Sequence, residues 1–218
     1  MLPTPVLKTV SEIYPKPEEG EQKKPIAKYG RFIWLDGPSN PGPSLAGKPH
    51  CVIWNTILYG SWVIEGGEDG LDYGNRVHRA YAEWFLKTNG SLYDKVHIEE
   101  AFIYPPFTLR PDILYGKNGE YGIIEVKSYG SNRIDEALPQ LSIYVYGLLN
   151  IGIQLKQAYL VLRDAVVSQD INALYEMGRY HYNYLRDAIR TPPEKPGRSC
   201  FKCPYALVCR IPKPTLFS

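Results

Sequence analysis

The segment "RPDILYGKNGEYGIIEVK" (residues 110–127) places charged side chains in a stretch otherwise rich in Ile, Leu and Tyr. Asp112 follows Arg-Pro, and Glu125 and Lys127 stand two positions apart. Carboxylate oxygens suit Mg²⁺ or Mn²⁺, which acidify bound water and neutralise phosphoryl charge. A nearby lysine orients that water or stabilises an oxyanion. The trio therefore predicts a hydrolytic metal site, and a solvent-exposed salt bridge is the alternative.

These side chains come together if the segment folds as a hairpin. Residues i and i+2 of a strand share one face, so Glu125 and Lys127 project together while Ile124 and Val126 face the core. The glycines of "GKNG" favour a tight turn between the two strands. The turn then returns Asp112 to the side of Glu125.

The flanking segments predict the elements that hold this hairpin. Apolar residues at helical spacing predict a helix over 72–88. Helix, strands, helix, strand and helix in this order are typical of an α/β fold with a mixed sheet. The other expected elements are a short strand pair around "KYGRFIWL", strands at 94–104, 107–115, 120–128 and 157–165, and helices at 139–150, with Pro139 in its first turn, and 170–190.

Two further motifs flank the hairpin in the sequence. "GNRVH" carries Gly74 and His78, and "QLSIY" carries Gln140 and Tyr144. Taken alone, His78 is more simply a core histidine on the apolar stripe of its helix. Gln140 and Tyr144 taken alone are an ordinary i, i+4 pair on a helix face.

Together, "RPD", "EVK" and these two motifs resemble the PD-(D/E)xK nuclease signature of the RecB-like branch. The resemblance implies a restriction-endonuclease-like core, with a mixed central sheet flanked by helices. It also implies that His78, Asp112 and Glu125 bind the metal ion, and that Asp112, Glu125 and Lys127 are catalytic. Gln140 and Tyr144 are then expected to line the DNA-binding groove.

Four cysteines bracket this predicted core. Cys51 stands alone upstream, and Cys200, Cys203 and Cys209 follow within ten residues of one another. Disulfides are disfavoured in the cytoplasm, so the spacing indicates Zn²⁺ or an iron–sulfur cluster. One ligand before the fold and three after it would act as a clasp between the two ends of the chain.

The cysteines and the nuclease motifs together resemble RecB-like nucleases with an iron–sulfur staple, here the CRISPR-associated Cas-four family, over about residues 51–209. The resemblance implies a metal-dependent exonuclease that trims DNA ends for CRISPR spacer acquisition, with single-stranded DNA cut 5′ to 3′. It implies Mn²⁺ or Mg²⁺ and an iron–sulfur cluster, with [4Fe–4S] favoured, [2Fe–2S] possible and zinc the alternative. DNA and the CRISPR integrase proteins are the implied partners.

The sequence also predicts the organisation of the chain. We expect an irregular proline-rich arm over 1–50, a RecB-like nuclease core over 51–190 and a cysteine-rich tail over 191–218 that completes the cluster site. With no apolar leader and no run long enough to span a bilayer, we expect a cytoplasmic protein without membrane contact. The net charge of +2 excludes a global basic field, so DNA binding requires local positive charge.

Three other functions remain open at this level. The first is a non-catalytic DNA-binding module with a structural metal clasp, which has no need of the full trio of Asp112, Glu125 and Lys127. The second is a redox or electron-transfer protein built around the cluster, which leaves the trio unexplained. The third is a RecB-like DNA-repair nuclease outside CRISPR.

Overall fold

The computed structural model describes residues 1–15, 33–35, 42–59, 62–64 and 70–194. A five-stranded sheet in the order β3-β6-β7-β8-β9 forms its centre. Neighbouring strands are antiparallel except β7 and β8, which run parallel. The strands are β3 (Lys95–Ile98), β6 (Ile113–Lys117), β7 (Glu120–Val126), β8 (Gln154–Val161) and β9 (Val166–Gln169).

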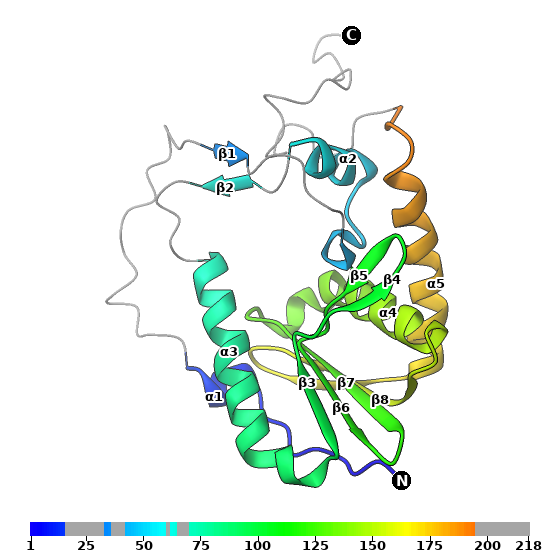
Figure 1. Cartoon of the computed structure of the whole chain (residues 1–218). Coiled ribbons are helices and arrows are strands. Elements are labelled where there is room, and N and C mark those ends of the chain that lie inside the picture. Colours follow the sequence, from blue (N-terminus) through cyan, green and yellow to red (C-terminus); the bar gives the residue numbers. More distant parts are fainter. Residues whose placement is uncertain (16–32, 36–41, 60–61, 65–69, 195–218) are drawn as a thin grey trace, which may run out of the picture.

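Helices cover both faces of this sheet (Figure 1). The long helix α3 (Gly70–Asn89) and the short α1 (Val10–Ile13) lie on one face. Helices α4 (Ile134–Asn150) and α5 (Ile171–Ala188) lie on the other, and α4 makes the crossover that the parallel strands require. The expected α/β class, with a mixed central sheet flanked by helices, is confirmed.

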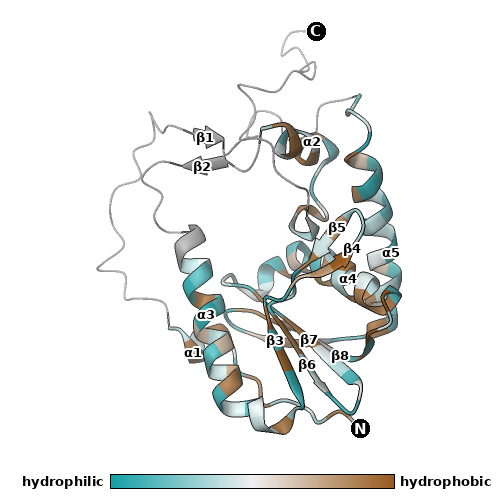
Figure 2. Ribbon diagram, viewed as in Figure 1, coloured by the Kyte–Doolittle hydropathy of each residue, from teal (hydrophilic) through white to brown (hydrophobic). Residues whose placement is uncertain are grey.

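The strands are buried on both faces because each face has its own core. Along β7, Ile124 and Val126 pack with Val77 and Phe85 under α3. Ile123 points the other way and packs with Leu141 under α4. Figure 2 shows the matching pattern, with hydrophobic residues along the strands and with hydrophobic and hydrophilic residues alternating around α3. Glu125 follows Ile123 by two residues, so it emerges on the α4 side of the sheet.

The hairpin forms as predicted, and its turn fixes the register. Asn118 and Gly119 both have positive φ, 52° and 80°, which is the backbone of a type I′ turn and the reason for an Asn-Gly pair. The turn pairs Lys117 with Glu120 and, at the far end, Ile113 with Ile124. One further step in this register sets Asp112 opposite Glu125.

Two expected strands are interrupted in the structure. Residues 94–104 form β3 and a separate strand β4 (Phe102–Tyr104), and residues 107–115 form β5 (Phe107–Leu109) and β6. β4 pairs with β5 in a hairpin of its own. Pro111 explains the second break because it has no amide hydrogen for the sheet ladder. Asp112 therefore stands at the head of a new strand rather than inside a continuous one.

Three other expectations need correction. Helix α4 begins at Ile134, so Pro139 lies inside the helix rather than in its first turn. The strand expected at 157–165 runs from Gln154 to Val161, and the sequence did not predict β9. The strand pair expected near residue 31 instead joins β1 (Ile33–Leu35) to β2 (Trp62–Ile64), with α2 (His50–Tyr59) between them in sequence. Long-range pairing of this kind leaves no local signal.

The first fifteen residues are docked on the α3 side of the sheet. Leu2 and Val10 are buried in the core there. Tyr81 and Tyr93 donate their hydroxyl protons to backbone carbonyls of this segment. Asn89 accepts from the Val6 amide and donates to its carbonyl, at 2.8 and 3.0 Å. These contacts hold α3, and with it His78, against the sheet.

Candidate active site

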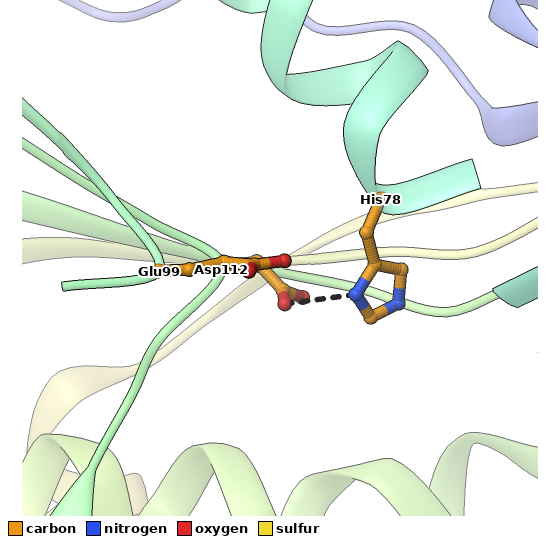
Figure 3. Close-up of side chains that lie close together, drawn as sticks. All are labelled: His78, Glu99 and Asp112. Carbon is orange, nitrogen blue, oxygen red and sulfur yellow. Dashed lines mark ion pairs between the residues drawn. The ribbon is translucent and has the colours of Figure 1, made fainter. Parts of the chain in front are cut away.

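A histidine and two carboxylates converge where the antiparallel strands β3 and β6 meet α3. Nδ1 of His78 lies 3.1 Å from Oδ1 of Asp112. One ligand atom each from His78, Glu99 and Asp112 can be chosen so that all lie within 4.8 Å of one another. Figure 3 shows His78 descending from α3 toward the two carboxylates. The group can therefore hold a divalent cation.

The strand register explains why Glu99 belongs to this group. β3 and β6 pair antiparallel up to Ile98 and Ile113, so one further step sets Glu99 opposite Asp112. The backbone continues the pairing, because the Glu99 amide donates to the Asp112 carbonyl at 3.1 Å. Glu99 has a φ of 49°, which ends the strand at this residue.

Glu99 was missed in the sequence because 94–104 reads as one strand. A Glu-Glu pair at 99–100 then passes for exposed charge on an edge strand. The sequence does carry one usable signal. The acidic pair interrupts the apolar residues of 94–104, the expected strand that comes just before the one with "RPD". Only the pairing of β3 with β6 shows which of the two glutamates meets Asp112.

Replacing Glu99 with glutamine should weaken Mn²⁺ binding, by about tenfold or more for loss of an anionic ligand. Glu100→Gln is the matched control, because Glu100 is bound to His97 instead. Titration calorimetry with Mn²⁺ on both variants measures the difference. Equal affinities for the two variants would remove Glu99 from the site.

Glu125 and Lys127 form a buried ion pair at the end of β7. Nζ of Lys127 donates to Oε1 of Glu125 at 2.7 Å, and the two side chains are 15% and 1% exposed. Burial, followed by the negative charge of Asp112, raises the pKa of Glu125 to about 7, although Lys127 opposes the shift. Burial alone would lower the pKa of Lys127, but the Glu125 and Asp112 charges outweigh it and raise that pKa.

Asp112 connects this ion pair to the histidine cluster. Its Oδ2 accepts from the Val126 amide at 2.7 Å, while Oδ1 faces His78. Burial would lower the pKa of His78, but the hydrogen bond and charge of Asp112, together with the charge of Glu125, raise it. The structure therefore brings His78, Asp112, Glu125 and Lys127 to one end of β6 and β7, as the sequence predicts.

Gln140 and Tyr144 reach the same place from α4. Oε1 of Gln140 accepts from Nζ of Lys127 at 2.8 Å, and its Nε2 donates to the Tyr144 hydroxyl at 2.9 Å. Tyr144 is 4% exposed and belongs to the core between α4 and the sheet. Both residues thus adjoin the site, and both are already engaged by protein groups.

The chemistry of these donors fits a divalent cation. His78 offers a ring nitrogen, and Glu99, Asp112 and Glu125 offer carboxylate oxygens, a set that suits Mn²⁺ or Mg²⁺. Oε2 of Glu125 is buried and has no hydrogen-bond partner in the described part of the chain. A buried carboxylate oxygen without a partner is costly. A cation bound beside it would remove that cost.

A cavity of about 550 Å³ opens beside the cluster, along α3. His78, Glu99 and Asp112 line one end of it. The remaining walls come from Ile98 and from one stripe of α3, namely Asn75, Arg79, Ala82, Glu83 and Leu86. A ligand in this cavity would lie with one end at the cluster.

Cys51 is the one predicted cluster ligand that the described residues include. It is buried near the start of α2. The adjacent His50 contacts the end of α5, with its Nε2 at 3.1 Å from the Ala188 carbonyl and 2.7 Å from that of Thr191. Cys200, Cys203 and Cys209 lie outside the described residues.

Comparisons with known proteins give only distant similarity. No family model matches the chain, and no curated protein sequence matches it. The crystal structure of SSO0001 is similar at a TM-score of 0.37 and 16% identity, covering 63% of this chain and 69% of that one. An alkaline exonuclease (LHK-Exo) from Laribacter hongkongensis has a TM-score of 0.36 and 15% identity, covering 55% and 70%. The functional assignment therefore rests on this chain's own residues.

Proposed function

We propose that the protein is a divalent-metal-dependent DNA nuclease that trims DNA ends. The observation that carries the proposal is the meeting of His78, Glu99 and Asp112 with the Glu125–Lys127 ion pair at one end of the sheet. An ordinary salt bridge needs neither the histidine nor the other two carboxylates, Glu99 and Asp112. A non-catalytic binding module needs no buried lysine beside them.

The residues of the site have distinct roles. His78, Glu99, Asp112 and Glu125 would hold the Mn²⁺ or Mg²⁺ ion. The bound ion would acidify water and neutralise charge on a phosphodiester. Lys127 has three protons to donate, of which two are used by Glu125 and Gln140. Its third proton is available to orient water or to stabilise the developing negative charge.

The cavity along α3 supports DNA as the substrate. Arg79 lines it together with Asn75 and has no ion-pair partner among the described residues. A guanidinium suits a phosphate, and the apolar wall of Ala82 and Leu86 suits a base or sugar. A single DNA strand laid along α3 would place a phosphodiester at the cluster. Single-stranded DNA is therefore our preferred substrate, and cutting from its 5′ end rests on the sequence resemblance.

A cleavage assay tests this function. Single-stranded DNA labelled at either end should be shortened with Mn²⁺ or Mg²⁺ and remain intact with EDTA. Ca²⁺ should support binding without cleavage, because it is larger and acidifies water less. Shortening from the 5′-labelled end gives the polarity. Binding of DNA without cleavage in any metal would favour the binding-module alternative.

We propose further that Cys51, Cys200, Cys203 and Cys209 hold an iron–sulfur cluster that clasps the two ends of the chain. The contact of His50 with the end of α5 supports this, because it places Cys51 close to where the chain continues toward Cys200. Protein purified without oxygen should be brown and contain iron, and Cys51→Ser should bleach it. One equivalent of zinc without iron would overturn the cluster and keep the clasp.

The role in CRISPR spacer acquisition and the integrase partners rest on the sequence resemblance.

A further inference from the structure

Lys127, Gln140 and Tyr144 form a continuous chain of hydrogen bonds behind the reacting centre. Nζ of Lys127 donates to Gln140 at 2.8 Å, and Gln140 donates to the Tyr144 hydroxyl at 2.9 Å. The chain therefore runs from Lys127 at the end of β7 to Tyr144 in the core under α4.

Burial limits what these two side chains can contact. Tyr144 packs among core residues of α4 and the sheet, so neither face of its ring is offered to a base. The carbonyl oxygen of Gln140 is occupied by Lys127 and its amide nitrogen by Tyr144. A nucleic-acid strand in the α3 cavity would meet neither group, because neither Gln140 nor Tyr144 lines it.

The chain also determines which way the Gln140 amide points. A glutamine side chain can flip and exchange its oxygen and nitrogen. An NH₂ group facing Lys127 would place donor against donor. The Tyr144 hydroxyl accepts from Nε2 of Gln140, and this contact favours the orientation in which Oε1 faces the ammonium. Tyr144 thus acts on Lys127 through Gln140.

Lys127 needs this support because its side chain is long. Fixing the flexible four-carbon stem of a lysine costs rotamer entropy. Two acceptors from different elements fix the ammonium, Glu125 from β7 and Gln140 from α4. Helix α4 is a rigid support, since Leu141 and Ile143 beside Gln140 are fully buried.

We propose that Gln140 and Tyr144 are positioning residues that hold the Lys127 ammonium at the reacting centre, in place of the direct DNA contacts expected from the sequence. This proposal rests on the proposed nuclease function. Their removal should slow the chemical step and leave DNA affinity unchanged. If these residues contacted DNA directly, their removal would instead weaken DNA affinity and leave the chemical step unchanged.

The test separates catalysis from binding. Gln140→Ala and Tyr144→Phe should each lower kcat on single-stranded DNA with Mn²⁺, by roughly tenfold or more for a misplaced catalytic group. KM, and Kd for DNA in Ca²⁺, should stay at the wild-type values. Gln140→Glu should restore most of kcat, because a carboxylate still accepts from Lys127 and also accepts from the Tyr144 hydroxyl.

Tyr115→Phe is the matched control. Tyr115 is fully buried and donates to Oε1 of Gln157 at 2.8 Å. The Tyr115→Phe substitution therefore removes a similar Tyr–Gln hydrogen bond away from the site. It should lower the melting temperature as Tyr144→Phe does and leave kcat unchanged. An equal fall of kcat in both tyrosine variants would overturn the proposal, because it would show a general loss of order.

A second readout does not depend on DNA cleavage. The ¹⁵N-labelled ammonium of Lys127, assigned by its absence in Lys127→Ala, should exchange its protons with water faster in Gln140→Ala than in wild type or Tyr115→Phe. Unchanged exchange, or a raised Kd with normal kcat, would overturn the positioning role. A wild-type protein that fails to cut DNA but shows the exchange difference would overturn only the proposed function.

Discussion

Lys127→Ala should abolish DNA cleavage while the fold and the metal site remain. In the proposed mechanism the lysine donates its third proton toward the reacting group, so its loss should remove stabilisation of the transition state. We expect kcat to fall by about 100-fold or more, as for the removal of one oxyanion-stabilising donor. The measurement is cleavage of end-labelled single-stranded DNA at saturating Mn²⁺, with circular dichroism to confirm the fold.

Saturating metal matters in this experiment because Lys127 also opposes the raised pKa of Glu125. Its loss should raise that pKa further and weaken Mn²⁺ binding at neutral pH. Lys117→Ala is the matched control, since Lys117 lies on the neighbouring strand and donates to the Leu92 carbonyl at the surface. Cleavage at the wild-type rate by Lys127→Ala would contradict the assignment of this site.

Mn²⁺ affinity should rise with pH through about 7, the pKa of Glu125. A cation binds the ionised carboxylate, so below this pH it must displace a proton. His78 acts in the same direction, because its pKa is also raised and a metal needs the neutral ring. Each displaced proton changes the affinity by about tenfold per pH unit below the pKa. Calorimetry in two buffers of different ionisation enthalpy measures the protons released.

The stability of the metal-free protein should depend on pH with the opposite sign. Glu125 has a pKa raised from 4.5, so its proton-linked contribution to stability is present below 4.5 and is lost as the pH rises through about 7. The melting temperature without metal should therefore fall between about pH 5 and pH 8, and Mn²⁺ should offset the fall. Glu125→Gln should lose both the proton release and tight Mn²⁺ binding. Affinity that does not change across this range would place Glu125 outside the metal site.

The hairpin and its charged residues were predictable because their signals are local. The Asn-Gly turn selects the two-residue hairpin, and alternation along "IIEVK" separates Glu125 from the apolar neighbours. The helix carrying His78 shows its apolar stripe over twelve residues or more. Turn chemistry and periodicity act over a few residues, so the sequence alone determined the α/β class and the residues of the charged trio.

Only the tertiary structure decided which other groups join them. Glu99 meets Asp112 because β3 pairs with β6. From the sequence alone, either glutamate of the 99–100 pair could have taken this place. The sequence placed Gln140 and Tyr144 on one helix face, but the packing of α4 turned that face toward Lys127 and buried the tyrosine. Strand pairing and helix packing join residues far apart in the chain, and such contacts leave no periodic trace in the sequence.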